Sequence, residues 1–260
     1  MGQVAISRDK VFFVHRMVQD AQHEVARRTP DDPTSVLRYY QSKFSWINDN
    51  KGPQLPKPLD GKIRVMAKRA REFDRVAPEL KEKLEAQRGL AYLFARFYGV
   101  SEGLSNNAIK EHAGADTALR TQLEEVKRLS RAARTEVKRG GKDNMSADAL
   151  AIYEEKFSAI RGIIDGLRNR LPNDSGIVER VDRVAHNADK FEKKDKPVLK
   201  RLQKQEQTLT GRFATFYQQA ERLCTETLKR PDPLGFNYVK TINFSSPGLK
   251  MPWSEMLNNG

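Results

Sequence analysis

Residues 146–172 read SADALAIYEEKFSAIRGIIDGLRNRLP. A large apolar side chain returns every three or four residues, which places these side chains on one face of an α-helix. Ser146 is a typical N-cap residue, and Pro172 ends the helix. The spacing continues for three heptads, so the segment predicts a long amphipathic helix packed against other helices. The apolar positions are Leu150, Tyr153, Phe157, Ile160, Ile164, Leu167 and Leu171.

The same period recurs along most of the chain. It predicts further helices over about 8–27, 35–47, 61–76, 78–98, 105–139, 175–191 and 197–230. Turns as short as Gly140-Gly141 join several of them, and short connections favour antiparallel neighbours. The heptads last only two to four turns, which favours packed helices over one long coiled coil. We therefore expect an all-α protein, an antiparallel bundle of about eight long amphipathic helices with an extended C-terminal arm.

Changes in composition suggest where the chain divides. Residues 51–61 hold Pro53, Pro56 and Pro58, which indicate a semi-rigid connector. We expect an N-terminal helical pair (1–50), this connector (51–61), a basic helical segment (62–104), a long-helix bundle (105–230) and the C-terminal arm (231–260).

Composition excludes several classes of protein. Cys224 is the one cysteine among 260 residues, so an intramolecular disulfide and a multi-cysteine zinc site are excluded, and a reducing compartment such as the cytoplasm, or a virion, is favoured. No stretch is apolar enough for a membrane span, and the N-terminus lacks a signal-peptide pattern. Asp182, His186 and Asp189 share a helix face, but three such residues on one helix more often form an exposed polar strip than a metal site. No catalytic or phosphate-loop motif occurs, so we expect no enzyme activity, no cofactor, no metal and no small-molecule substrate.

Basic side chains are concentrated and aligned. Of the formal net charge of +13, +6 falls between residues 51 and 100. Two sets of four cations have the spacing 4, 3, 4, which puts each set on one helix face. The first basic row is Arg64, Lys68, Arg71 and Arg75, with Lys57 and Lys62 just upstream. The second basic row is Lys127, Arg131, Arg134 and Lys138.

Two interpretations of these rows are open. Like charges one turn apart destabilise a helix, and a polyanion would offset that repulsion. A solvated face is the alternative, because acids lie beside both rows, including Glu72 near the first and Glu136 near the second. The sequence pI of 9.8 favours a polyanion. No motif for base-specific recognition occurs, so the expected ligand is the phosphate backbone of a nucleic acid, with an anionic membrane surface as the second candidate.

The last 30 residues differ from the helical body. Aromatic and apolar side chains alternate with polar ones, and prolines prevent a long helix. Such a segment typically docks in a groove of its own chain or of a second copy, and both arrangements stay open. The residues expected to dock are Phe236, Tyr238, Ile242, Phe244 and Trp253.

These features favour a non-enzymatic, self-associating helical protein that binds nucleic acid through phosphate contacts, as a nucleocapsid, virion or packaging component does. The homo-oligomer would form through the C-terminal arm. The alternative is a membrane-surface or scaffold protein, such as a BAR-like dimer or a secreted effector, that binds anionic lipid or a protein partner.

Overall fold

The computed structural model describes residues 6–27, 33–112, 116–171 and 176–230, and these are almost entirely helical. The elements are α1 (Arg8–Arg27), α2 (Pro33–Asn50), α3 (Lys57–Asp74), α4 (Ala77–His112), α5 (Thr117–Arg139), α6 (Ala147–Leu167), α7 (Ile177–Lys190), a π-helix (Phe191–Asp195) and α8 (Lys196–Lys229). Because α7, the π-helix and α8 follow each other without a break, the eight α-helices of the described residues form seven separate rods. The prediction of an all-α bundle is confirmed.

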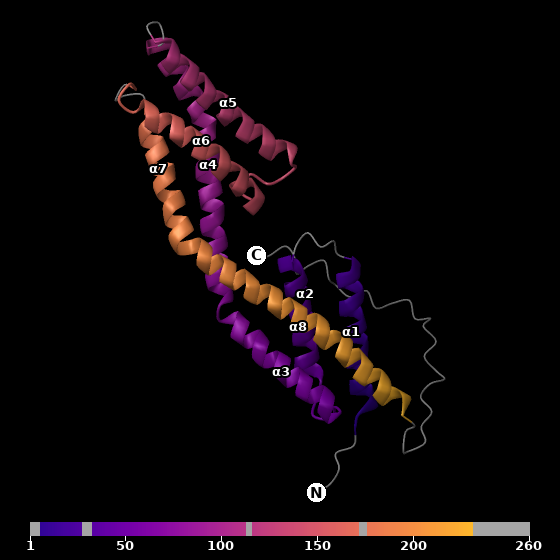
Figure 1. The fold of residues 1–260 in the computed structure, drawn as a ribbon. Coiled ribbons are helices and arrows are strands. Elements are labelled where there is room, and N and C mark those ends of the chain that lie inside the picture. The colour runs from indigo at the N-terminus through magenta and orange to yellow at the C-terminus, as the bar shows by residue number, and fades with distance from the viewer. Residues whose placement is uncertain (1–5, 28–32, 113–115, 172–175, 231–260) are drawn as a thin grey trace.

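Two groups of helices lie end to end (Figure 1). At one end α1, α2 and α3 pack on α8, and at the other end α5, α6 and α7 pack on α4. We call these the α8 bundle and the α4 bundle. The π-helix lies where the α7–α8 rod changes direction, and it also packs on α4. A π-helical turn inside a helix is a recognised cause of such a bend.

Each bundle has an aromatic cluster at its centre, and each cluster contains a fully buried tyrosine. In the α8 bundle the Tyr217 hydroxyl donates a hydrogen bond of 2.8 Å to the carbonyl oxygen of Tyr40. In the α4 bundle the Tyr98 hydroxyl donates one of 2.6 Å to the carbonyl oxygen of Tyr153. The hydroxyl of the fully buried tyrosine is therefore paired in each cluster. The other rings are Phe44, Phe213 and Phe216 in the first cluster, and Phe94, Phe97 and Phe157 in the second.

Helix limits match the sequence predictions closely at most positions. Helix α1 has the predicted range, and the Ser7 hydroxyl accepts a hydrogen bond of 3.4 Å from the Lys10 backbone N–H. Ser146 is the N-cap of α6 as predicted, because its hydroxyl accepts a bond of 3.1 Å from the Ala149 N–H. All seven heptad positions from Leu150 to Leu171 are buried.

Four expected boundaries differ from the structure. Helix α6 ends at Leu167, before the Pro172 that was expected to end it. The connector is shorter than 51–61, because α3 begins at Lys57 with Pro58 in its first turn, where a missing N–H is harmless. The helix expected over 105–139 is two helices, since α4 continues to His112 and α5 begins at Thr117. The unit expected over 105–230 is divided as well, because α8 packs on α1, α2 and α3. The arm, with its five named residues, lies outside the described residues.

One buried hydroxyl has no partner within the described part of the chain. The Ser105 side chain on α4 is fully buried and its Oγ makes no hydrogen bond. An unsatisfied buried hydroxyl destabilises the folded state, so Ser105→Ala is expected to raise the free energy of unfolding by about 1 kcal/mol. Urea denaturation of the variant measures this.

Ser101 provides the matched control for that substitution. It is also fully buried on α4, but its hydroxyl lies 2.7 Å from the Ser130 hydroxyl and is bonded to it. Ser101→Ala removes a satisfied bond and should lower the free energy of unfolding by about 1 kcal/mol. If both variants were destabilised equally, Ser105 would have an unrecognised partner.

Candidate nucleic-acid interface

The first basic row lies on the outer face of α3. Ile63, Met66 and Phe73 turn the opposite face of this helix into the core of the α8 bundle. All four cations of the row are consequently exposed to solvent, with 76% of the Arg64 side chain and 81% of the Lys68 side chain accessible. Exposed cations at this spacing form a continuous positive strip along about 16 Å of helix.

Ion pairs neutralise this strip only in part. Arg64 Nη2 lies 2.7 Å from the Asp60 carboxylate, and Lys68 Nζ lies 4.0 Å from that of Glu72. Both pairs lie within α3. Asp60 is only 22% exposed and also pairs with Lys51, but both cations of the row are well exposed. Each pair therefore contributes less than about 1 kcal/mol, and a phosphate can replace the carboxylate as the partner of the cation. Arg71 and Arg75 have no ion-pair partner among the described residues.

The two upstream lysines have different surroundings. Lys57 is exposed in the first turn of α3, where it can extend the row. Lys62 lies toward α8, and its Nζ donates a hydrogen bond of 2.6 Å to the Gln219 side chain. Lys62 therefore stabilises the packing of α3 on α8. We do not include it in the row, because its ammonium group is already hydrogen-bonded within the fold.

The second basic row is used differently. Arg131 and Arg134 on α5 both pair with the Glu102 carboxylate on α4. Glu102 is only 23% exposed, and its bonds to two guanidinium groups hold α5 against α4. Lys127 and Lys138 have no ion-pair partner in the part of the chain that is described. The row therefore offers two uncommitted cations, at its two ends.

The Glu102 pairs imply a pH dependence of stability. The Arg131 guanidinium, aided by the charge of Arg134, holds the pKa of the Glu102 carboxyl below its usual value. A carboxyl whose pKa is lowered on folding stabilises the protein above its unfolded pKa, and this contribution is lost as the pH falls through the folded pKa.

Glu102→Gln tests this contribution. At pH 7 the variant is expected to lose up to about 1 kcal/mol of unfolding free energy, because the side chain is partly exposed and screened. The difference between variant and wild type should shrink as the pH falls through the lowered pKa of Glu102. Urea denaturation over a series of pH values from 7 downward measures it, and a difference that does not change with pH would contradict the electrostatic origin.

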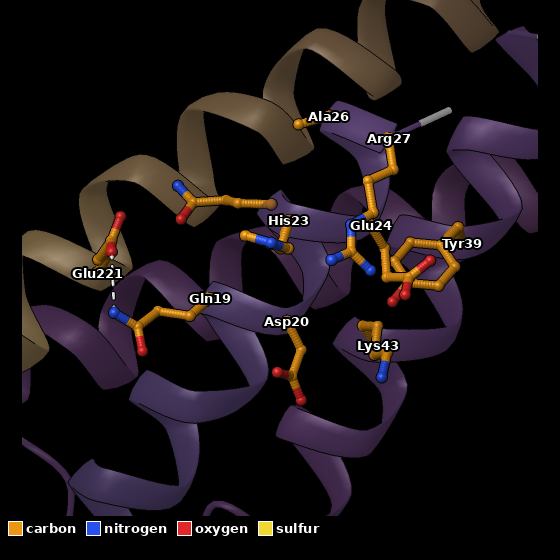
Figure 2. A pocket seen from close by; sticks show the side chains of 10 residues that line it. Gln19, Asp20, His23, Glu24, Ala26, Arg27, Tyr39, Lys43 and Glu221 are labelled. Carbon is orange, nitrogen blue, oxygen red and sulfur yellow. Dashed lines mark hydrogen bonds between the residues drawn. The ribbon is translucent and has the colours of Figure 1, made fainter. Parts of the chain in front are cut away.

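A groove that the sequence analysis did not predict lies between α1, α2 and α8. Its volume is about 800 Å³. Figure 2 shows Glu24 and Arg27 of α1 pointing toward Tyr39 of α2, and Gln19 donates a hydrogen bond of 3.4 Å to Glu221 of α8. The remaining lining residues are Asp20, Gln22, His23, Ala26 and Lys43.

Acids and bases are balanced in this groove. Three carboxylates lie among two permanent cations and one histidine, so the groove does not attract a polyanion as a row of cations does. Within the described residues, no group of His, Cys, Asp and Glu is arranged to hold a metal ion. The sequence shows that Gln19, His23 and Arg27 share one face of α1, because they are four residues apart. It does not show that this face lies opposite α2 and α8, which depends on the tertiary structure.

Other side chains considered in the sequence have structural roles. Asp182 accepts hydrogen bonds of 3.0 Å and 2.5 Å from the Arg168 guanidinium, which joins α7 to the end of α6. Cys224 is fully buried, and burial raises the pKa of its thiol to about 12.

Comparisons of the chain with protein-family models, with curated proteins and with solved structures gave no match. In the described part of the chain, every helix is too short or too polar to cross a membrane.

Proposed function

We propose that this chain is a non-enzymatic helical protein that binds nucleic acid through its phosphate backbone, as a nucleocapsid, virion or packaging component. The first basic row carries the proposal. Four aligned cations stand on a face that contributes nothing to the core, and Arg71 and Arg75 lack an ion-pair partner among the described residues. Such a row repels itself, and a phosphate backbone relieves the repulsion through charge-assisted bonds and counterion release.

Self-association belongs to the same proposal. A polyanion is much longer than a strip of about 16 Å, so many copies would bind along it. Residues 231–260 would supply the contact between copies, with Phe236, Tyr238, Ile242, Phe244 and Trp253 as the docking side chains. Their apolar, proline-interrupted sequence favours a docking arm.

The salt dependence of binding tests the phosphate contacts. A fluorescein-labelled 20-nucleotide single-stranded DNA is titrated with the protein at several salt concentrations, and anisotropy gives the affinity. If each cation of the row meets one phosphate, log K should fall with log salt with a slope of about −3. A slope near zero, or no binding at 50 mM salt, would refute the proposal.

An anionic membrane surface is the competing ligand for the same row, because it too offers a high density of negative charge. Co-sedimentation with phosphatidylserine vesicles separates the two. If the protein binds these vesicles but not the oligonucleotide, the nucleic-acid function is wrong and the membrane-surface role replaces it.

A further inference from the structure

An aromatic side chain stands between two arginines on the outer face of α4. Tyr92 is 51% exposed, which is unusual in a helix whose neighbouring apolar residues are in the core. Arg88 and Arg96 lie one turn before and one turn after it, and both are exposed. We call these three residues the α4 strip.

Packing of the fold does not account for this strip. The opposite face of α4 supplies the core with Leu90, Ala91, Phe94, Phe97 and Tyr98. Neither Arg88 nor Arg96 has an ion-pair or hydrogen-bond partner in the described residues. Exposed Lys81 and Glu85 lie in the preceding turns, so the whole face keeps a positive balance.

Three glycines continue the same face. Gly89 lies one turn before Tyr92, and Gly99 and Gly103 follow Arg96 at helical spacing. A Cβ atom built on any of the three meets nothing within 4 Å. Close packing therefore does not require glycine at these positions. Each glycine lowers helix stability by up to about 1 kcal/mol relative to alanine. Gly89, one turn from Tyr92, leaves the helix surface next to the ring without a side chain, so a planar ligand can approach there.

We infer that the α4 strip is a stacking site for unpaired bases of single-stranded nucleic acid. The inference rests on the proposed function and narrows its ligand. The Cα atoms of Arg88 and Arg96 lie about 12 Å apart along the helix axis, and that of Tyr92 lies midway between them. A base can stack on the Tyr92 ring while Arg88 and Arg96 bind the phosphates on either side, the usual combination in proteins that bind single strands without sequence preference.

Chemistry favours a single strand over a duplex. In a duplex the bases are stacked on each other, so the ring would find no free face and only the arginines would bind. An anionic lipid surface would bind the arginines and would also accept the ring at headgroup level. Phosphatidylserine vesicles are therefore a third probe, and a loss of vesicle binding by Tyr92→Ala without a loss of single-strand binding would overturn the inference.

The test compares Tyr92→Ala with wild type on two probes, a 20-nucleotide single strand and a 20-base-pair duplex. Loss of one stacked base should weaken single-strand binding about tenfold. Duplex affinity should stay within about twofold. Tyr92→Phe keeps the ring and should retain wild-type affinity for both probes. Because Tyr92 is exposed, the variants are expected to fold normally, which circular dichroism checks.

Trp46 offers a matched control. It is 46% exposed on α2, and its ring lies 6.2 Å from that of Phe13. No arginine lies one turn from it, and the two charges at that distance, Lys43 and Asp49, are of opposite sign. Trp46→Ala should leave single-strand affinity within about twofold.

The outcomes separate this inference from the proposed function. If wild type binds both probes with steep salt dependence and Tyr92→Ala changes neither affinity, the stacking site is wrong and the phosphate-binding function stands. Equal weakening on both probes would also overturn the stacking site. If wild type binds neither probe, both proposals fail.

Discussion

Changing Arg64, Lys68, Arg71 and Arg75 together to glutamate is expected to lower the affinity for single-stranded DNA by about three orders of magnitude at 0.1 M salt. Each lost phosphate contact forfeits the release of about 0.7 counterion, and four contacts together account for a change of that size. The log–log salt slope should become less steep by about 3 in the same variant, which leaves only the contribution of cations outside the row. Fluorescence anisotropy over a salt series measures both quantities.

The fold should tolerate this change, because all four side chains are exposed and the core face of α3 is untouched. The two ion pairs that are lost contribute less than about 1 kcal/mol each. A melting temperature within a few degrees of wild type would confirm that weaker binding reflects the lost cations and not unfolding.

A second charge reversal separates the row from bulk charge. Lys193, Lys194, Lys200 and Lys204 are exposed in the π-helix and α8 and have no ion-pair partner in the described part of the chain. Changing these four lysines to glutamate alters the net charge by the same amount as the charge reversal of the α3 row. It should reduce affinity less than about tenfold, through long-range attraction alone. Equal losses in the two variants would show that net charge binds the ligand and that the α3 row is not a site.

The two basic rows show how far sequence reasoning extends. Both have the same 4, 3, 4 spacing, so the sequence treats them as equivalent. Arg131 differs from Arg64 because the fold brings Glu102, 29 residues away, into its reach. Helical periodicity decides which side chains share a face, but it does not say which face meets another helix. The α4 strip was missed for the opposite reason, because Tyr92 belongs to an apolar run in which the neighbouring rings are core residues.

Helix prediction succeeded where local signals agreed and failed where they were weak. The heptad spacing and the Ser146 cap are local signals that agree with each other, and together they predict the start of α6 and its buried face without reference to tertiary packing. The break between α4 and α5 lies between His112 and Thr117, and the Asp116 carboxylate accepts hydrogen bonds from the N–H groups of Ala118 and Leu119 there. Asp116 is an ordinary N-cap, but Ser105 and Asn106 are equally good cap residues, and α4 continues through both.

Replacing Phe94 by alanine is expected to lower the free energy of unfolding by about 3–5 kcal/mol. The ring is fully buried on α4 at the centre of the second aromatic cluster, with centroids 5.2 Å from Phe157 and 6.2 Å from Tyr153. Its removal leaves a cavity, because the surrounding rings are fixed by their own contacts and by the Tyr98 hydrogen bond. Phe213→Ala should cost a similar amount in the α8 bundle, where that ring is equally buried.

The pair of variants also tests whether the two bundles unfold together. The α7–α8 rod passes from one bundle into the other, and α4 packs on α8 as well as on α5, α6 and α7. At the bend, Lys83 of α4 pairs at 3.0 Å with Asp195 of the π-helix, and both side chains are less than 20% exposed. Unfolding of either bundle would therefore remove a helix on which the other bundle packs. We expect a single calorimetric transition for the whole chain, and each variant should lower its midpoint temperature. Tyr92→Ala on the exposed face of α4 is the control and should change stability by less than about 0.5 kcal/mol. Two separate transitions, with Phe94→Ala moving one and Phe213→Ala the other, would show that the π-helix uncouples the bundles.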